Sequence, residues 1–251
     1  MKNAKNYTTI FVLALLLPLA SNAQKTKAPN IEMVFVKGGT FTMGCTEEQI
    51  DCEGDESPAH KVTLSDYSIG KYEITQAQWR AVMGNNPSTF SGCDDCPVEN
   101  ISWQDASAFC KQLSRLTGKK YSLPTEAQWE YAARGGSKGK RQMYAGSDKI
   151  AEVSWYSANA DKRTHEVGTK KPNELGIYDL SGNVWEWCSD WYGGYTSAEQ
   201  TNPQGASDRT TRVLRGGGWR DDAQNCRTAF RGNSAPTFNN SNIGFRVVLL
   251  P

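Results

Sequence analysis

The amino-acid sequence predicts an α+β domain with short helices and strands and long irregular loops. The chain of 251 residues carries 23 glycines, eight tryptophans and seven cysteines. Three helical segments begin with capping signals, and short runs typical of strands surround them. This composition is typical of a loop-rich fold that aromatic side chains and disulfides hold together. No internal repeat or low-complexity segment divides the chain, so we expect one domain.

Residues 1–23 have the pattern of a secretory signal peptide. A lysine-containing start precedes the apolar run 10–17, and small or polar residues follow it up to Ala23. The apolar run is shorter than the roughly 20 residues of a membrane-spanning helix. After cleavage near Ala23 we expect a periplasmic or secreted protein, with a flexible tether over 24–30 and a domain over 31–251.

Short strands are expected at the start of the domain, because β-branched and aromatic residues gather there between turn signals. The predicted strands are 32–36, 40–43, 61–64 and 67–71. The pair Gly38-Gly39 forms the first turn, and the acidic segment 45–58 is expected to be an exposed loop. Long loops predominate toward the C-terminus, with strands predicted near Tyr178, Val213 and Phe245.

Three short helices each begin with a capping box. In this motif a Thr or Ser hydroxyl, and a Gln or Asp side chain three residues later, satisfy free backbone N–H groups. The predicted helices are 75–84, 102–118 and 125–135, and a glycine ends each of them. In the second helix Phe109, Cys110 and Leu113 fall on one face at helical spacing, so we expect that face to pack on the core.

The charge of the chain is balanced, with 28 basic and 27 acidic residues and no block of like charge. Proteins that bind nucleic acid or anionic membranes usually carry a basic patch or stripe. The composition therefore argues against nucleic acid as a partner, and the short apolar run argues against membrane insertion.

Four cysteines are placed to form two local disulfides, which are the usual fate of spaced cysteines in an oxidising compartment. Cys45 and Cys52 flank the acidic loop, and Cys93 and Cys96 bracket two aspartates. Two alternatives remain open at this point. The four thiolates together are a possible zinc site, and Cys93-x-x-Cys96 is a possible redox motif.

The other three cysteines lie far apart in the sequence. Cys110 falls on the apolar face of the second predicted helix and is expected to be a buried free thiol. Cys188 and Cys226 then remain, and we expect them to form a third disulfide with each other.

The stretch LGIYDLSGNVWEWCSDWYGG, 175–194, has the composition of a cation-binding loop. Asp179 and Glu186 are separated by Gly182 and Asn183, so a curved loop can direct two carboxylates and several carbonyl oxygens at one centre. Calcium prefers such an all-oxygen arrangement, with six to eight ligands. Acidic residues in a glycine-containing loop are also commonly just solvated, and the loop alone does not decide between the two.

Eight motifs occur in an order that resembles the formylglycine-generating enzyme family, also called the sulfatase-modifying factor family. They are MVFVKGGTFTMG, GKYEITQAQW, PVENISWQDASAFC, YSLPTEAQWEYAARGG, GIYDLSGNVWEW, RVLRGGGW, CRTAFR and NIGFRVV. The resemblance extends from Glu32 to Leu249. It implies the compact α+β fold of that family, which has little regular structure and is related to C-type-lectin-like folds.

The resemblance also implies a structural calcium site. Its ligands are the side chains of Asp179 and Glu186 and the backbone oxygens of Gly182 and Val184, with Asp179 where the family often has Asn. A second family site would begin at Asn159. The connection that follows Asn159 is too short to supply the remaining ligands, so we do not expect a complete second site.

Members of the family oxidise a sulfatase cysteine to formylglycine, using oxygen and a copper(I) ion that two thiolates hold. Position by position, this chain has Gly218 for the family's serine, Asp221 for the first cysteine and Cys226 for the second. A cuprous ion selects soft sulfur ligands, and a carboxylate is a hard ligand. Half of the copper site is missing, and Cys226 is the one candidate catalytic residue that remains.

The sequence favours a non-catalytic, exported member that binds a protein, peptide or glycan, or that takes part in envelope assembly. The candidate groove residues are Trp185, Trp219, Asp221, Arg227 and Arg231. The alternative is a copper-dependent oxidase that converts a sulfatase cysteine to formylglycine. A third hypothesis is a different enzyme that uses Asp221 and Asp222 for acid–base chemistry.

Overall fold

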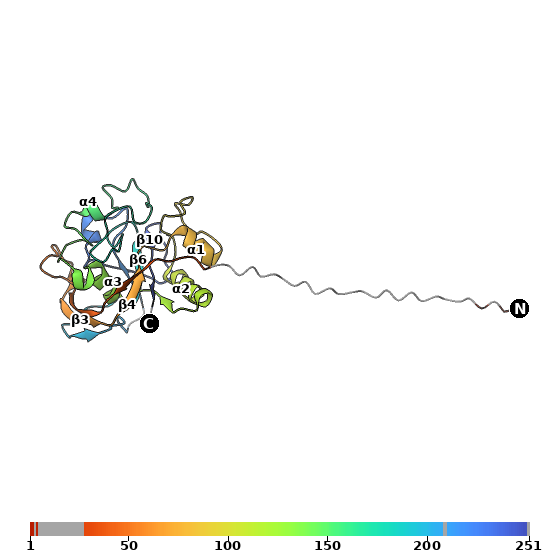
Figure 1. Ribbon diagram of the computed structural model, residues 1–251, viewed down its shortest axis with the longest axis horizontal. Coiled ribbons are helices and arrows are strands. Elements are labelled where there is room, and N and C mark those ends of the chain that lie inside the picture. The colour runs from red at the N-terminus through yellow and green to blue at the C-terminus, as the bar shows by residue number, and fades with distance from the viewer. Residues whose placement is uncertain (3, 5–27, 208–209, 250–251) are drawn as a thin grey trace.

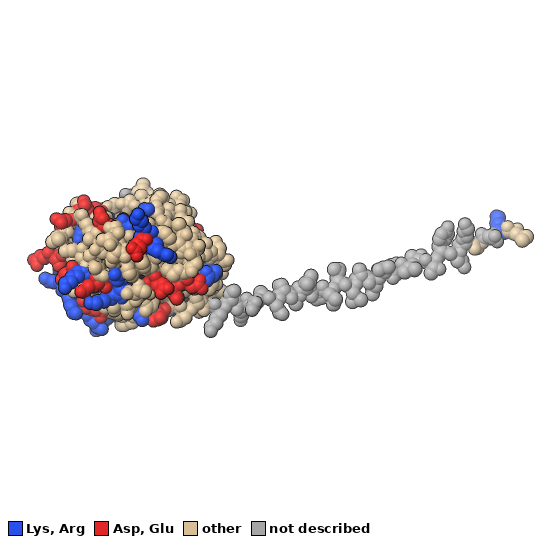
Figure 2. Space-filling model, turned by 90° about the horizontal axis from the view of Figure 1, so that it is seen from above, with Lys and Arg blue, Asp and Glu red and all other residues tan. Residues whose placement is uncertain are grey.

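The computed structural model of the chain describes residues 1–2, 4, 28–207 and 210–249. Most of the predicted signal peptide, 1–23, and of the tether, 24–30, lies outside these residues. Within the described part, no helix is both long and apolar enough to cross a bilayer. Figure 1 shows the helices and small sheets gathered in one body, and Figure 2 shows acidic and basic side chains interspersed on one of its faces.

The first sheet brings the two ends of the domain together. Its strands are β1 (Met33–Val36), β4 (Tyr67–Gly70), β11 (Val248–Leu249) and β5 (Tyr121–Ser122), in that order. All of these pairings are antiparallel, and Ile69 of β4 stands opposite Val34 on one side and Val248 on the other. Ile69 is fully buried, so this β4 position links the first and last strands through the core.

Two further sheets complete the architecture. One consists of β10 (Ile243–Gly244), β6 (Trp185–Trp191), β8 (Arg212–Arg215) and β9 (Arg231–Ser234), in that order. The other consists of β2 (Gly39–Met43), β3 (His60–Leu64) and β7 (Gln200–Thr201), with β2 at one edge. The pairing of β6 with β8 shifts register between Trp187 and Trp191, which is typical of a bulged strand.

The helices begin where the capping boxes predict. They are α1 (Gln76–Met83), α2 (Trp103–Thr117), α3 (Glu126–Ala133) and α4 (Ile150–Val153), with 3-10 turns η1 (Gly54–Glu56), η2 (Gly136–Lys138) and η3 (Ala223–Cys226). The hydroxyls of Thr75, Ser102 and Thr125 each accept a bond from the backbone N–H three residues later. Gly84 and Gly118 end α1 and α2 in left-handed conformation, with φ of 81° and 72°.

The strand predictions are right at the start of the chain and incomplete after it. The first four predicted strands correspond to β1–β4, and Val213 lies in β8. The strand predicted near Tyr178 is wrong, because this residue lies in a loop and its N–H donates one isolated bond to the carbonyl of Lys71. Phe245 lies between β10 and β11 and in neither of them.

In the described residues, the core consists of three clusters of buried side chains, and each cluster contains one free cysteine. Cys188 packs with Trp129 and Val213 beside α3, Cys110 packs with the α2 face around Phe109, and Cys226 packs in a small cluster with Tyr144 and Val153. Cys188 and Cys226 are both buried and free, so the third disulfide predicted above is wrong. Each of these two thiols fills a different part of the core, and neither has the other for a neighbour.

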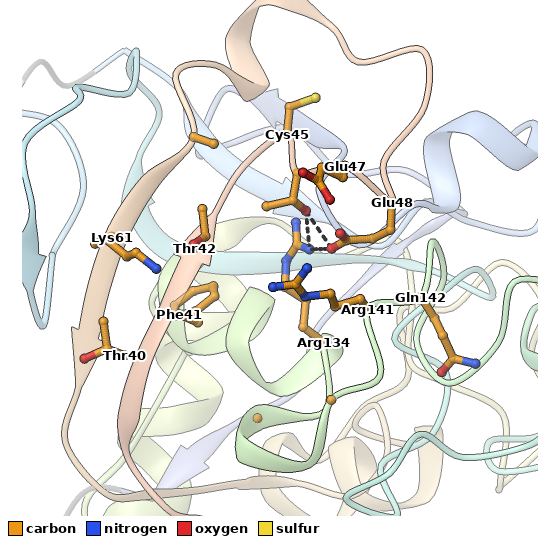
Figure 3. A pocket seen from close by; sticks show the side chains of 14 residues that line it. Thr40, Phe41, Thr42, Cys45, Glu47, Glu48, Lys61, Arg134, Arg141 and Gln142 are labelled. Carbon is orange, nitrogen blue, oxygen red and sulfur yellow. Dashed lines mark hydrogen bonds and ion pairs between the residues drawn. The ribbon is translucent and has the colours of Figure 1, made fainter.

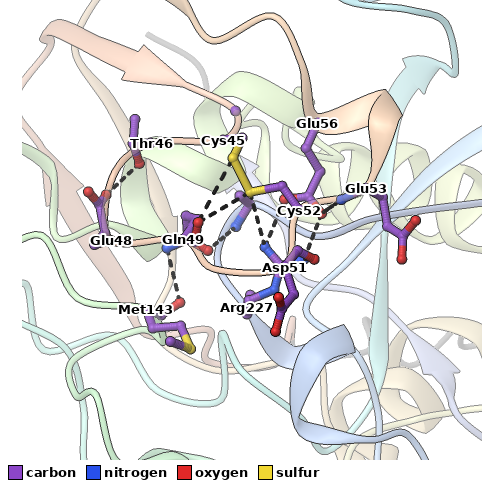
Figure 4. The surroundings of a disulfide bond; sticks show 12 residues. Cys45, Thr46, Glu48, Gln49, Asp51, Cys52, Glu53, Glu56, Met143 and Arg227 are labelled. Atoms are coloured by element: carbon purple, nitrogen blue, oxygen red, sulfur yellow. Dashed lines mark hydrogen bonds and ion pairs between the residues drawn. A yellow bond between two sulfur atoms is a disulfide. The ribbon is translucent and has the colours of Figure 1, made fainter.

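Both local disulfides are confirmed. The S–S distances are 2.05 Å for Cys45–Cys52 and 2.09 Å for Cys93–Cys96. These bonds exclude a zinc site that uses the four thiolates. Figure 4 shows the first bond closing the acidic loop, with the Arg227 guanidinium close by. Cys110 is a buried free thiol, as its place on α2 predicts.

Buried arginines connect the sheets to the helices and loops. Arg215 of β8 is fully buried and donates to Glu126 at 2.8 Å and to Glu130 at 2.7 Å, both on α3. Arg231 of β9 donates to Glu126 as well, at 2.7 Å. Because burial removes water from these charges, each one depends on its protein partners for stabilisation.

Candidate functional site

The loop before β6 brings the predicted calcium ligands Asp179 and Glu186 into one buried cluster. Glu186 is fully buried and accepts two bonds of 2.6 Å from the guanidinium of Arg246 and one of 2.9 Å from the indole N–H of Trp129. Asp179 accepts a bond of 2.7 Å from the backbone N–H of Gly168. The loop is therefore folded around its carboxylates, which are not solvated as in an ordinary acidic loop.

Glu73 is a third carboxylate of this cluster, and the sequence did not predict its presence there. It lies before α1 and is 1% exposed. Its side chain accepts bonds from the backbone N–H of Val184, at 3.1 Å, and from the side-chain amide of Asn183, at 2.6 Å. The one available signal was its place in the motif GKYEITQAQW, which gives no information about what lies near it in space.

The cluster of Glu73, Asp179 and Glu186 holds three buried carboxyl groups. Arg246 is the cation that acts on all three carboxylates. Burial, and then the charges of Asp179 and Glu186, raise the pKa of Glu73 well above its usual value. Burial also raises the pKa of Asp179 to about 6. The cluster therefore places three buried carboxyl groups beside one guanidinium.

The other predicted ligands are the carbonyls of Gly182 and Val184 and the side chain of Asn159. Among the described residues, no three His, Cys, Asp or Glu side chains are grouped as metal ligands, so the carbonyls of Gly182 and Val184 would have to complete any calcium site. Asn159, of the incomplete second site, uses its side-chain oxygen to accept from the N–H of Tyr156 at 2.9 Å. The next carbonyl, of Ala160, bonds to the ring of His165 at 2.9 Å.

Asp221 takes the place of the family's first cysteine and has a structural role here. One oxygen of its carboxylate accepts from the indole N–H of Trp185 at 2.8 Å, from the N–H of Gly218 at 3.0 Å and from the amide of Asn242 at 3.3 Å. These bonds tie the 218–221 turn to β6 and to the chain before β10. Burial raises the pKa of this carboxyl above its usual value.

Cys226 is fully buried and is not a thiolate at neutral pH. Burial is the largest cause that raises its pKa to about 12, and the charges of Asp221 and Asp222 add to the effect. Its sulfur lies against the backbone, because a Cβ placed on Gly217 would stand 2.8 Å from it. A nucleophilic cysteine is ionised and accessible. Cys226 is neither.

The donor set at this position does not fit a cuprous ion. The family's ion is held by two thiolates, and this chain offers one buried thiol and one carboxylate that already accepts three hydrogen bonds. Asp222, the other member of the proposed acid–base pair, is exposed and accepts a bond from the hydroxyl of Ser157 at 3.1 Å. The two aspartates thus lie in different environments, with Asp221 committed to its turn.

Most of the predicted groove residues pack against other parts of the protein and do not line an open groove. Trp185 is 8% exposed and lies so close to Gly232 that a Cβ there would be 2.8 Å from its ring. Trp219 is half-buried and meets the ring of Phe90 edge-on, with centroids 5.4 Å apart. Arg227 is buried in an ion pair with Glu56, at 2.6 Å, so its assignment to an open groove is wrong.

Arg231 lines a cavity. The other residues that line this cavity are not the predicted groove residues. The cavity measures about 210 Å³. Its polar lining includes His60, Glu126, Asp190, Tyr195 and Arg231. Arg231 lies over the ring of Tyr195 at 3.9 Å, and His60 meets that ring at 4.8 Å between centroids. The sequence does not predict this cluster, because its members come from four separate parts of the chain.

Asp190→Asn is expected to remove a loss of stability that the wild-type protein shows as the pH rises from about 4 to about 7. Burial, and then the charge of Glu126, raise the pKa of Asp190 from 3.8 to about 7. The folded protein therefore holds a proton that the unfolded chain has released in this interval. Since one pKa unit corresponds to about 1.4 kcal/mol, the loss amounts to a few kcal/mol.

Urea unfolding of both proteins at several pH values measures this difference. The Asn side chain can accept the same bonds from the N–H of Glu126 and the hydroxyl of Ser189, both at 3.0 Å in the wild type. Parallel stability curves for the two proteins between pH 4 and pH 7 would contradict the assignment to Asp190.

This chain is similar to known proteins over most of its length. A family model described as "Sulfatase-modifying factor enzyme 1-like domain" matches residues 19–250, so the match begins inside the predicted signal peptide. The chaperone protein LppX of Paenibacillus barcinonensis is 34% identical over 267 residues, which cover 86% of this chain and 89% of the relative. The formylglycine-generating enzyme of Bos taurus is 29% identical over 288 residues, which cover 87% of this chain and 75% of the enzyme.

A solved structure, Treponema denticola variable protein 1, has the same fold. It superposes with a TM-score of 0.79 at 33% sequence identity, covering 87% of this chain and 95% of that protein. The likeness confirms the irregular α+β fold that the motifs predict.

Proposed function

This chain belongs to the sulfatase-modifying factor enzyme 1-like family, and we propose that it is a non-catalytic, exported member that binds a polypeptide. The observation that carries the proposal is the state of the copper position. Asp221 is held by three internal hydrogen bonds, and the thiol of Cys226 is buried with a pKa of about 12. Neither group is available for the oxidase chemistry of the family.

The choice of a polypeptide ligand has support from the relatives. One of them carries the name of a chaperone protein, and it is similar to this chain over most of both sequences. Export has support from the signal-peptide pattern of residues 1–23 and from the disulfides, because such bonds persist in oxidising compartments. A role in envelope assembly requires both properties.

The binding test uses a permanently unfolded, carboxymethylated polypeptide that carries a fluorophore. The chain without its first 23 residues is expected to bind this probe saturably, and an unlabelled unfolded polypeptide is expected to compete. The unmodified polypeptide, folded and unlabelled, is the control and is expected not to compete. Absence of binding to the unfolded probe, or saturable binding of oligosaccharides alone, would contradict the proposal.

Calcium is the cofactor that this proposal includes, as a structural ion at Asp179 and Glu186. The three buried carboxyl groups beside the one guanidinium of Arg246 support the assignment. The carbonyls of Gly182 and Val184 are the other family ligands, and oxygen donors alone suit calcium. The ion would offset the repulsion between the buried carboxylates.

Calcium is therefore expected to raise the thermal midpoint of unfolding relative to chelator. An ion at a hundredfold excess over its Kd stabilises the folded state by about 2.7 kcal/mol, which corresponds to about 5 °C or more for a chain of this size. Asp179→Ala should abolish the difference, and Glu152→Ala, at a surface position, should keep it. Equal midpoints in calcium and chelator for the wild-type protein would rule the ion out.

A further inference from the structure

An open cavity of about 510 Å³ lies on another part of the surface, apart from the copper position and the calcium loop. Its walls come from the edge strand β2, the loop closed by Cys45–Cys52, and the segment that follows η2 (Figure 3). The side chains that line it include Phe41, Glu47, Glu48, Lys61, Arg134 and Arg141. None of the candidate residues named from the sequence, Cys45 excepted, lines it.

Arg134 forms a fixed wall of this cavity. Its guanidinium donates to Glu130 at 2.8 Å, to Glu48 at 2.6 Å and to the carbonyl of Gly44 at 2.7 Å. The Cys45–Cys52 disulfide closes the same loop. With its charge already paired, Arg134 fixes the shape of the cavity and leaves the binding of a ligand to other groups.

Lys61 and Arg141 are the cations that remain available. Within the described residues, neither side chain makes a hydrogen bond or an ion pair, and both line the cavity. Figure 3 shows them on opposite sides, with the ammonium of Lys61 and the guanidinium of Arg141 pointing toward each other. Glu47, also on the rim, is the one carboxylate of the lining without a cation partner. The lining therefore has one positive charge in excess.

The edge of β2 gives the cavity a second binding feature. This strand pairs with β3 on one side, and within the described residues no strand pairs with its other side. Thr40, Phe41 and Thr42 of this strand line the cavity. An unpaired strand edge is a template for an extended chain, whose backbone forms the bonds while pockets select its side chains.

We propose that this cavity binds an extended acidic segment of a polypeptide, whose carboxylate lies between Lys61 and Arg141 while its backbone runs along β2. The planar guanidinium of Arg141 matches a carboxylate, and Phe41 supplies an apolar contact for the stem of the acidic side chain. The inference rests on the proposed function and names the ligand and place of that function.

The test is a fluorescence anisotropy titration with two labelled peptides of alternating Val and Thr that differ at one central residue, Glu in one and Gln in the other. The wild-type protein is expected to bind the Glu peptide about tenfold more tightly, with a preference that falls as salt is added. The Lys61→Ala, Arg141→Ala double variant should bind both peptides equally. Glu47→Gln should increase the preference about twofold, since it removes a competing carboxylate.

The controls separate this inference from the function on which it depends. Lys119→Ala, Arg163→Ala removes two exposed cations elsewhere and should keep the preference, and unfolding midpoints should be unchanged in all variants. If the double variant at the cavity keeps the wild-type preference while the unfolded probe still binds, the site is wrong and the function survives. If the wild-type protein binds neither peptide nor the unfolded probe, both are wrong.

Discussion

Arg215→Met is expected to lower the free energy of unfolding by about 3–5 kcal/mol, because it leaves buried carboxylates without one of their cations. The guanidinium lies between Glu126 and Glu130 on α3 and also donates to the carbonyl of Thr228 at 2.5 Å. Burial alone would raise the pKa of Glu126. The charges of Arg231 and Arg215 outweigh burial and lower this pKa to about 2. Methionine fills much of the volume and supplies none of the charge.

Urea unfolding of Arg215→Met and of the control Arg220→Met measures this effect. Arg220 is exposed, so its replacement should change the free energy of unfolding by no more than about 0.5 kcal/mol. A wild-type-like Arg215→Met would mean that Arg231 and Arg134 together satisfy both carboxylates, and that the buried network tolerates the loss of a member.

Gly182→Ala is expected to lower the free energy of unfolding by about 2–5 kcal/mol, for two separable reasons. Gly182 has a φ of +84°, where a residue with a Cβ pays about 1–2 kcal/mol. The added Cβ would also stand 2.1 Å from the hydroxyl of Ser154 and 2.4 Å from the carbonyl of Trp155. Because the second neighbour is backbone, the loop must move, which costs a further 1–3 kcal/mol or so.

Two other glycines separate these contributions. Gly176 has a φ of +79° and nothing within 4 Å of an added Cβ, so Gly176→Ala should show the conformational cost alone. Gly194 lies in open space without a positive φ, so Gly194→Ala should be nearly neutral. Equal losses at 176 and 182 would contradict the close approach of the loop to Trp155.

Local signals in the sequence predicted local structure well. The three capping boxes fix the starts of α1, α2 and α3, because the bonds involved join residues three apart. The two local disulfides follow from the same short range. Strands such as β6 and β9 have no comparable signal, since their pairing depends on chain that lies far away in the sequence.

Long-range partners explain what the sequence did not predict. Pairing Cys188 with Cys226 by elimination fails because the fold assigns each thiol to its own core cluster. The motif CRTAFR suggested that Arg227 and Arg231 line a groove. In the structure both are buried, and they form ion pairs with Glu56 and Glu126. Glu73 joins the predicted calcium loop from more than a hundred residues away, because it accepts a hydrogen bond from the backbone N–H of Val184.

The decisive measurement is incubation of the protein with copper(I), oxygen and a Cys-x-Pro-x-Arg peptide, followed by mass spectrometry of the peptide. With a carboxylate at 221 and a buried thiol at 226, the peptide is expected to keep its thiol mass and to show no aldehyde. Aldehyde formation by the wild-type protein that disappears in Cys226→Ser would contradict the account and identify the chain as an oxidase.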